Sequence, residues 1–168
     1  REWVLLGHQV TVITCAPNFP RGRVYKGYRN RLWASEYIEG IRVIRVWSYI
    51  AANEGFFKRT LDYMSYMFSA ICAAPFVSKV DLIVGTSPQF FTVCAARVVS
   101  AFKRVPWVFE LRDIWPESIR AVGAMKESRV LDALEKLELY LYRKADAIVA
   151  VTHSFKGSLI SRGVDASK

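Results

Sequence analysis

Glu110, Arg112 and Asp113 form the densest group of polar side chains next to a predicted strand. They close an apolar run over residues 107–111 and stand just before Trp115-Pro116. Glu110 and Arg112 point to the same face of such a strand, and Asp113 lies past its end. Acidic and basic groups at this position can hold hydroxyls or offset phosphate charge, so we predict that all three line a ligand site. The alternative is a structural Glu–Arg pair that fastens the loop.

Two further strand ends lead into predicted helices. Ser87-Pro88 follows a strand over residues 81–85, and Thr152-His153 follows one over 147–151. We expect Ser87 to be the N-cap of a helix that reaches Lys103, with Pro88 in its first turn. The free N–H groups of a helix N-terminus suit a phosphate or a sugar oxygen. Simple capping is the alternative at both places.

A frame of strands and helices has to hold these residues. Short apolar, β-branched runs predict strands near residues 9–14, 41–46, 81–85, 107–111 and 147–151. They alternate with helical segments and are apolar on both faces, which indicates an α/β, Rossmann-like fold with a mostly parallel sheet and helices on both faces. Ligands bind beyond the carboxyl ends of such strands. We therefore expect residues 14–17, 86–88, 112–113 and 152–154 to line one crevice.

The predicted helices fill the segments between the strands. They are expected over residues 56–78, from Pro116 to near Gly123, from a cap at Ser128 to Lys144, and from Ser154 to Gly163. The chain of 168 residues fits one domain, so we expect 1–168 to be a single Rossmann-like domain. Residues 2–6 are predicted to be the last turns of a helix closed by Gly7, so the domain is expected to be truncated at its start.

The composition points to an anionic partner. The net charge is +9, and the segment 16–31 contains basic residues but no acid. Its basic residues are Arg21, Arg23, Lys26, Arg29 and Arg31. Nucleic acid, a phosphorylated ligand or an anionic membrane surface would each match this charge. The helix over 56–78 is apolar nearly all round, which is more than one buried face requires.

Several kinds of site are missing from the sequence. The three cysteines have no metal-ligand spacing and are expected to be buried free thiols, so we predict no metal and no cofactor. We find no Ser-His-Asp order, P-loop or GxGxxG pattern. The most apolar stretch, residues 63–77, is shorter than the ~20 residues of a membrane span.

The chain resembles the N-terminal domain of family 4 glycosyltransferases over nearly its whole length. One similar segment is the run Phe-Glu-Leu-Arg-Asp-Ile-Trp-Pro at 109–116, which is similar to the branch that builds bacterial surface polysaccharides. The other similar segments are residues 3–14, 40–46, 81–88 and 144–152. Each motif alone is loose, but their order and spacing together are specific.

The resemblance implies half of a two-domain, GT-B type enzyme that transfers a hexose or an N-acetylaminosugar from a nucleotide-sugar donor. Transfer would proceed with retention and without a metal. The N-terminal half would bind the acceptor, and the donor would sit mainly on a C-terminal half that this sequence lacks, so the chain alone is expected to be inactive. Asp113 would be catalytic, by holding a sugar hydroxyl or orienting the acceptor. The expected substrate-binding residues are Glu110, Arg112, Ser87, Pro88, Thr152 and His153.

The resemblance also implies a lipid-pyrophosphate-linked acceptor, so we expect a peripheral enzyme at the cytoplasmic face of the membrane. The basic residues of segment 16–31 and the apolar helix would then meet an anionic membrane surface. Three alternatives remain: a GT-B sugar-nucleotide epimerase, a basic nucleic-acid-binding module and a non-catalytic regulatory domain. The Arg-Asp-Ile-Trp-Pro run favours the transferase, and we do not expect a nucleic-acid partner.

Overall fold

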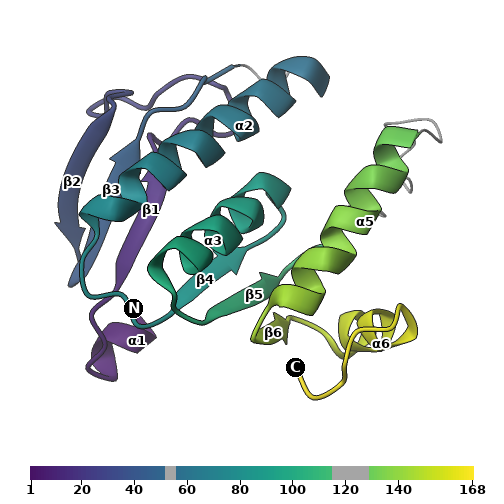
Figure 1. The fold of residues 1–168 in the computed structure, drawn as a ribbon. Helices are drawn as coiled ribbons and strands as arrows, with labels where there is room; N and C mark the ends of the chain where they lie inside the picture. Colours follow the sequence, from purple (N-terminus) through teal and green to yellow (C-terminus); the bar gives the residue numbers. More distant parts are fainter. Residues whose placement is uncertain (52–55, 115–128) are drawn as a thin grey trace. The chain divides into compact units, whose positions relative to one another are not determined.

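The strands of the described residues form two three-stranded sheets, and from β3 onward helices alternate with them along the chain (Figure 1). The computed structural model describes residues 1–51, 56–114 and 129–168. The chain divides into two units, Arg1–Val77 and Ser78–Lys168, each with one sheet. Every strand pair but one is parallel, so the predicted α/β, mostly parallel fold is confirmed.

The first unit is built on sheet A, whose strand order is β1-β3-β2. β1 (Thr11–Cys15) and β3 (Ile41–Val46) are parallel, and β2 (Trp33–Ile38) is antiparallel to β3. The hairpin turns through Glu39 and Gly40, at φ of 49° and 80°. Two positive φ values match the twist of the flanking strands, and glycine adopts one of them without strain.

Helix α2 (Phe56–Ala73) packs against β1 and β3. Its buried residues include Tyr66, whose hydroxyl donates to the carbonyl of Ile13 at 2.8 Å. The helix was expected to reach residue 78 but ends at Ala73, where the 3₁₀ turn η1 (Ala74–Phe76) begins. Pro75 causes this early end, because it has no N–H to donate and it disfavours helical geometry in the residue before it.

The second unit is built on sheet B, with the strand order β4-β5-β6 and all strands parallel. The strands are β4 (Ile83–Thr86), β5 (Trp107–Leu111) and β6 (Ala147–Ala150). The helices of this unit are α3 (Phe90–Lys103), α5 (Arg129–Lys144) and α6 (His153–Ser161). All three strands match the predicted positions closely.

The core of the second unit lies on one face of β5. Trp107, Phe109 and Leu111 alternate along the strand and are fully buried, with Val93 of α3 and Tyr142 of α5 in the same cluster. The rings of Phe109 and Tyr142 have centroids 4.8 Å apart. Burying each such large apolar side chain stabilises the unit by about 1.5–3 kcal/mol, so this cluster fixes the strand that carries Glu110.

The predicted cap of α3 at Ser87 is wrong, and the predicted start of α6 differs from the observed one by a single residue. Helix α3 begins at Phe90 with Gln89 as its N-cap, because the Ser87 hydroxyl binds the backbone at residues 112–113. Helix α6 begins at His153, one residue earlier than expected, because Thr152 caps it by accepting from the N–H of Phe155 at 3.1 Å. The short helix expected after Pro116 and the cap at Ser128 lie outside the described residues.

Candidate functional site

The carboxyl ends of β4 and β5 bring the main predicted site residues together. Thr86 and Glu110 are direct neighbours in the parallel register. The Thr86 hydroxyl donates to the Glu110 carboxylate at 2.7 Å. This bond holds the Glu110 carboxylate, whose side chain is 31% exposed, at the edge of the sheet. Ligands of open parallel sheets bind beyond this edge.

Ser87 joins the two strand ends through its side chain. Its Oγ accepts from the backbone N–H of Arg112 at 2.8 Å and from that of Asp113 at 3.2 Å. Its own N–H donates to the carbonyl of Glu110 at 3.0 Å. Ser87 is 3% exposed, so this geometry favours a positioning role for Ser87 in place of direct substrate contact.

Arg112 and Asp113 complete the group at the end of β5. The Arg112 Nε lies 3.8 Å from Glu110 Oε1, and the Arg112 side chain is 59% exposed. An exposed pair of this kind adds little stability, about 0–1 kcal/mol. Because the Arg112 side chain is exposed, its guanidinium is accessible to an anionic ligand group. Asp113 is the next residue, and it is half-buried. The arrangement can accept hydrogen bonds from hydroxyls and donate to phosphate oxygens.

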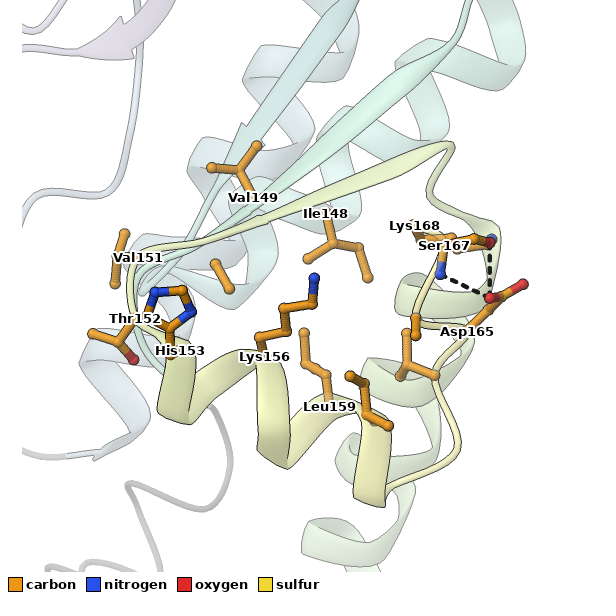
Figure 2. A pocket seen from close by; sticks show the side chains of 14 residues that line it. Ile148, Val149, Val151, Thr152, His153, Lys156, Leu159, Asp165, Ser167 and Lys168 are labelled. Atoms are coloured by element: carbon orange, nitrogen blue, oxygen red, sulfur yellow. Dashed lines mark hydrogen bonds between the residues drawn. The ribbon is translucent and has the colours of Figure 1, made fainter.

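Thr152 and His153 line a separate cavity of about 510 Å³ between β6, α6 and the last residues of the chain. Figure 2 shows Lys156 extending from α6 into this cavity, with His153 one turn earlier on the same helix. The Thr152 hydroxyl is used as the helix cap. Glu110, Arg112 and Asp113 do not line this cavity, although β5 and β6 end at the same edge of sheet B.

A second polar cluster lies at the carboxyl ends of the parallel strands β1 and β3 in sheet A. Cys15 ends β1, Ser48 follows β3, and Asp62 reaches them from α2. Burial raises the pKa of Asp62 and that of the Cys15 thiol, and the charge of Asp62 raises the pKa of the thiol further. Residues 14–17, one of the four predicted ligand-binding strand ends, belong to the first unit, whereas the other three strand ends belong to the second unit. The expectation that all four line one crevice therefore stays a prediction.

All five basic residues predicted to meet an anionic surface are exposed. They are Arg21, Arg23, Lys26, Arg29 and Arg31. Asn30 ties the segment to the residues that follow β3, because its Nδ2 donates to the carbonyl of Ser48 at 2.7 Å. The segment therefore projects its cations from the carboxyl end of sheet A.

Within residues 1–51, 56–114 and 129–168, no group of three or more His, Cys, Asp or Glu residues is arranged to hold a metal ion. In the same ranges no helix is both long enough and apolar enough to span a bilayer. Of the three free cysteines, Cys15 and Cys94 are half-buried, whereas Cys72 is exposed and so differs from the expectation.

Three residues of these sites are not singled out by the sequence analysis. Thr86 is the last residue of β4, and the register of β4 and β5 makes it the hydrogen-bond partner of Glu110. Lys156 follows His153 by three residues, a spacing that places both on one helix face. Asp62 had no signal, because only the packing of α2 on the sheet brings it to Ser48 and Cys15.

The whole chain, residues 1–168, matches the family described as Glycosyl transferase 4-like domain. The chain belongs to this family, and its mostly parallel strands with polar residues at their carboxyl ends agree with that assignment. It is also 24% identical over 177 residues to a putative colanic acid biosynthesis glycosyl transferase, WcaI, of Escherichia coli (strain K12). That match covers 98% of this chain and 42% of the relative, so the chain spans less than half of the relative's length.

Proposed function

We propose that this chain is the acceptor-side part of a glycosyltransferase of polysaccharide biosynthesis. The observation that carries the proposal is the group of Glu110, Arg112 and Asp113 at the carboxyl edge of a parallel sheet, held there by Thr86 and Ser87. The family match over the full chain and the name of the Escherichia coli relative support the same reaction class.

Each residue of the group has a separate role in this proposal. Asp113 accepts a hydrogen bond from an acceptor hydroxyl and orients it for attack. Arg112, whose side chain is 59% exposed, binds a phosphate oxygen of the substrate. Glu110 sets the direction of Arg112, and Ser87 fixes the backbone that carries Asp113. Pro88, Thr152 and His153 contact the substrate from neighbouring strand ends.

The donor is a nucleotide sugar that binds mainly to another part of the intact protein. Transfer needs donor and acceptor to be oriented against each other, a contribution that can reach about 7–11 kcal/mol of the barrier. One half supplies only part of this orientation, so the chain by itself does not turn over. We propose retention at the sugar carbon and no metal requirement, in line with the resemblance of the sequence.

The acceptor is a saccharide linked to a lipid pyrophosphate at the cytoplasmic face of a membrane. The exposed basic residues of segment 16–31 lie on the same unit as the ligand edge of sheet A. Near an anionic surface each such charge adds about 1 kcal/mol of attraction. These cations therefore offset the charge of the anionic lipid that surrounds the acceptor in the membrane.

Sugar transfer by the intact protein tests the proposal. The protein is incubated with radiolabelled nucleotide sugars and a bacterial lipid extract, and label is counted in the lipid fraction, with and without a chelator. We expect labelled lipid from at least one donor, unchanged by the chelator, and none from residues 1–168 alone. Release of the free sugar into water with every donor and acceptor would contradict transfer.

A further inference from the structure

Strand β2 forms one edge of sheet A and carries exposed apolar side chains (Figure 1). Trp33, Tyr37 and Ile38 of the strand are exposed, and Leu32 just before it keeps 82% of its surface accessible. An exposed apolar edge strand is a template for pairing with another chain unless proline, lysine or a bulge protects it. β2 contains neither proline nor lysine, and it pairs residue for residue with β3, without a bulge. The outer edge of β2 can therefore accept a further strand.

The one charged side chain of β2 does not protect this edge. Glu36 is paired with Arg45 of β3, whose Nη2 lies 2.6 Å from Glu36 Oε1. This pair is neutral, so it presents no net charge to repel an approaching strand. Phe76 adds to the apolar surface, because its ring packs edge-on against that of Trp33 with centroids 5.9 Å apart and stays 72% exposed.

The turn after β2 decides which of its backbone groups face outward. Only Glu39 and Gly40 separate Ile38 from Ile41, and hydrogen bonds between the two flanking residues close a turn of this length. Hydrogen-bonded and non-bonded pairs alternate along an antiparallel ladder, so residues 34, 36 and 38 direct their N–H and C=O groups at β3. Residues 33, 35 and 37 direct theirs away from β3, and no strand of the described residues pairs with this outer row.

We propose that β2 pairs antiparallel with β2 of a second copy of this chain, across a two-fold axis at Ser35. Two-fold symmetry makes every contact occur twice. Trp33 then lies opposite Tyr37 of the second copy on one face of the joined sheets, and Leu32 lies opposite Ile38 on the other face. Each of these exposed side chains gains an apolar partner, and such cross-strand pairs stabilise a sheet.

Charge complementarity at the two ends of β2 favours a second copy as the occupant. Arg31 lies just before the apolar run and Glu39 just after it, and both are exposed. With the axis at Ser35, Arg31 of each copy lies opposite Glu39 of the other, so opposite charges meet at both ends of the interface. Glu39 also lies near Arg1, whose Nε is 3.5 Å from its Oε2, but both side chains are exposed and such a contact is weak.

The neighbouring registers are less favourable. The outward row of backbone groups also allows a two-fold axis at Glu36 or at Ala34. An axis at Glu36 sets the Glu36 carboxylates of the two copies against each other, and like charges directly opposite are destabilising. An axis at Ala34 sets Glu36 against Leu32, so a charged side chain replaces the apolar partner. The sequence of the edge therefore favours the axis at Ser35.

Sedimentation velocity of the intact protein over a series of concentrations tests the inference. Paired short strands bury a small interface, so the parent should show a reversible monomer–dimer equilibrium. Arg31→Glu or Glu39→Arg sets like charges at both ends of the interface, and each alone should weaken the dimer by about ten-fold or more. The double variant restores opposite charges and should dimerise like the parent. Lys136→Glu reverses an exposed cation of α5 and should change nothing.

Ser35→Pro tests the backbone pairing at the axis. The N–H of Ser35 points away from β3, so proline removes the donor that faces the second copy and leaves the hydrogen bonds to β3 in place. The variant should stay monomeric at concentrations at which the parent dimerises, with an unchanged circular dichroism spectrum. If this variant does not fold, the charge variants still decide, because their substitutions lie at exposed side chains.

Three outcomes would overturn the inference. A parent that stays monomeric at every concentration would leave an extended peptide of another protein as the occupant of the edge. A dimer that neither the charge reversals nor Ser35→Pro weakens would use a different surface. A double variant that dimerises no better than Arg31→Glu or Glu39→Arg alone would contradict the register at Ser35.

Discussion

The Oγ of Ser87 accepts a hydrogen bond from the backbone N–H of Asp113 at 3.2 Å. Ser87 directly follows β4, and Asp113 lies two residues beyond β5, so this bond joins two strand ends across the ligand edge of sheet B. The same oxygen accepts from the N–H of Arg112. One buried hydroxyl therefore fixes the backbone of both Arg112 and Asp113 in the proposed acceptor-binding group.

Removing that hydroxyl should weaken the second unit. Ser87→Ala leaves the N–H groups of Arg112 and Asp113 without their acceptor, and an unsatisfied buried donor costs about 1–3 kcal/mol. Urea unfolding measures the loss. The control is Ser161→Ala, whose hydroxyl makes only an exposed bond to the carbonyl of Ser158 and should change stability by less than about 0.5 kcal/mol. Equal effects of the two substitutions would show that Ser87 does not hold this loop.

Gly85 should not tolerate a side chain. A Cβ there would lie 2.7 Å from the Cβ of Ala96, so Gly85→Ala forces α3 away from β4 and should cost about 1–3 kcal/mol. Gly157→Ala on α6 is the matched control, because nothing lies within 4 Å of its added Cβ. It should stabilise the chain by about 0.4–1 kcal/mol through lower entropy of the unfolded chain. If Gly85→Ala and Gly157→Ala change the free energy of unfolding in the same direction, the close packing of α3 on Gly85 would be contradicted.

The strands could be predicted because their apolar runs coincide with their buried positions. Trp107, Phe109 and Leu111 alternate with Val108 and Glu110, and the strand they predict is the one observed. The start of α3 could not be predicted, because Ser87-Pro88 has the residue types of a helix cap. Only the folded chain shows that the backbone of residues 112–113, more than twenty positions away, binds the Ser87 hydroxyl.

Part of the candidate site was visible in the sequence for the same reason. Arg112 follows Glu110 by two residues and lies just past the end of β5, so the period of an extended chain predicts that their side chains meet, and their Oε1 and Nε atoms are 3.8 Å apart. Thr86 donates to a partner in another segment of the chain, and Asp62 approaches Cys15 from a helix far away in sequence; no local pattern marks either residue. Their positions depend on strand register and on the packing of α2, which sequence periodicity does not encode.

The stability of the second unit should depend on the protonation of Glu138. This side chain is 1% exposed, and burial raises the pKa of its carboxyl above the ordinary 4.5, although Tyr142 and Arg162 donate to it. A raised folded-state pKa contributes stability that is full below the unfolded value and is lost as the pH rises through the folded value.

Glu138→Gln removes this titration. Urea unfolding at a series of pH values gives the free energy of unfolding of the parent and of the variant. The parent value minus the variant value should be highest below about pH 4.5 and should fall toward neutral pH. If this difference in unfolding free energy rises with pH instead, the ion pair of Glu138 with Arg162 outweighs the effect of burial, and the prediction is wrong.

The most direct test of the central claim compares two aspartates at opposite ends of sheet B in the intact protein. Asp113 lies past the carboxyl end of β5, whereas Asp81 precedes the amino end of β4. Asp113→Asn should lower kcat/KM for sugar transfer by about 10²-fold or more, because the neutral amide holds the acceptor hydroxyl less strongly in the orientation for attack. It should change the free energy of unfolding by less than about 0.5 kcal/mol. Asp81→Asn should leave kcat/KM unchanged. Equal kcat/KM values for the two variants and the parent would contradict the placement of the acceptor site at Asp113.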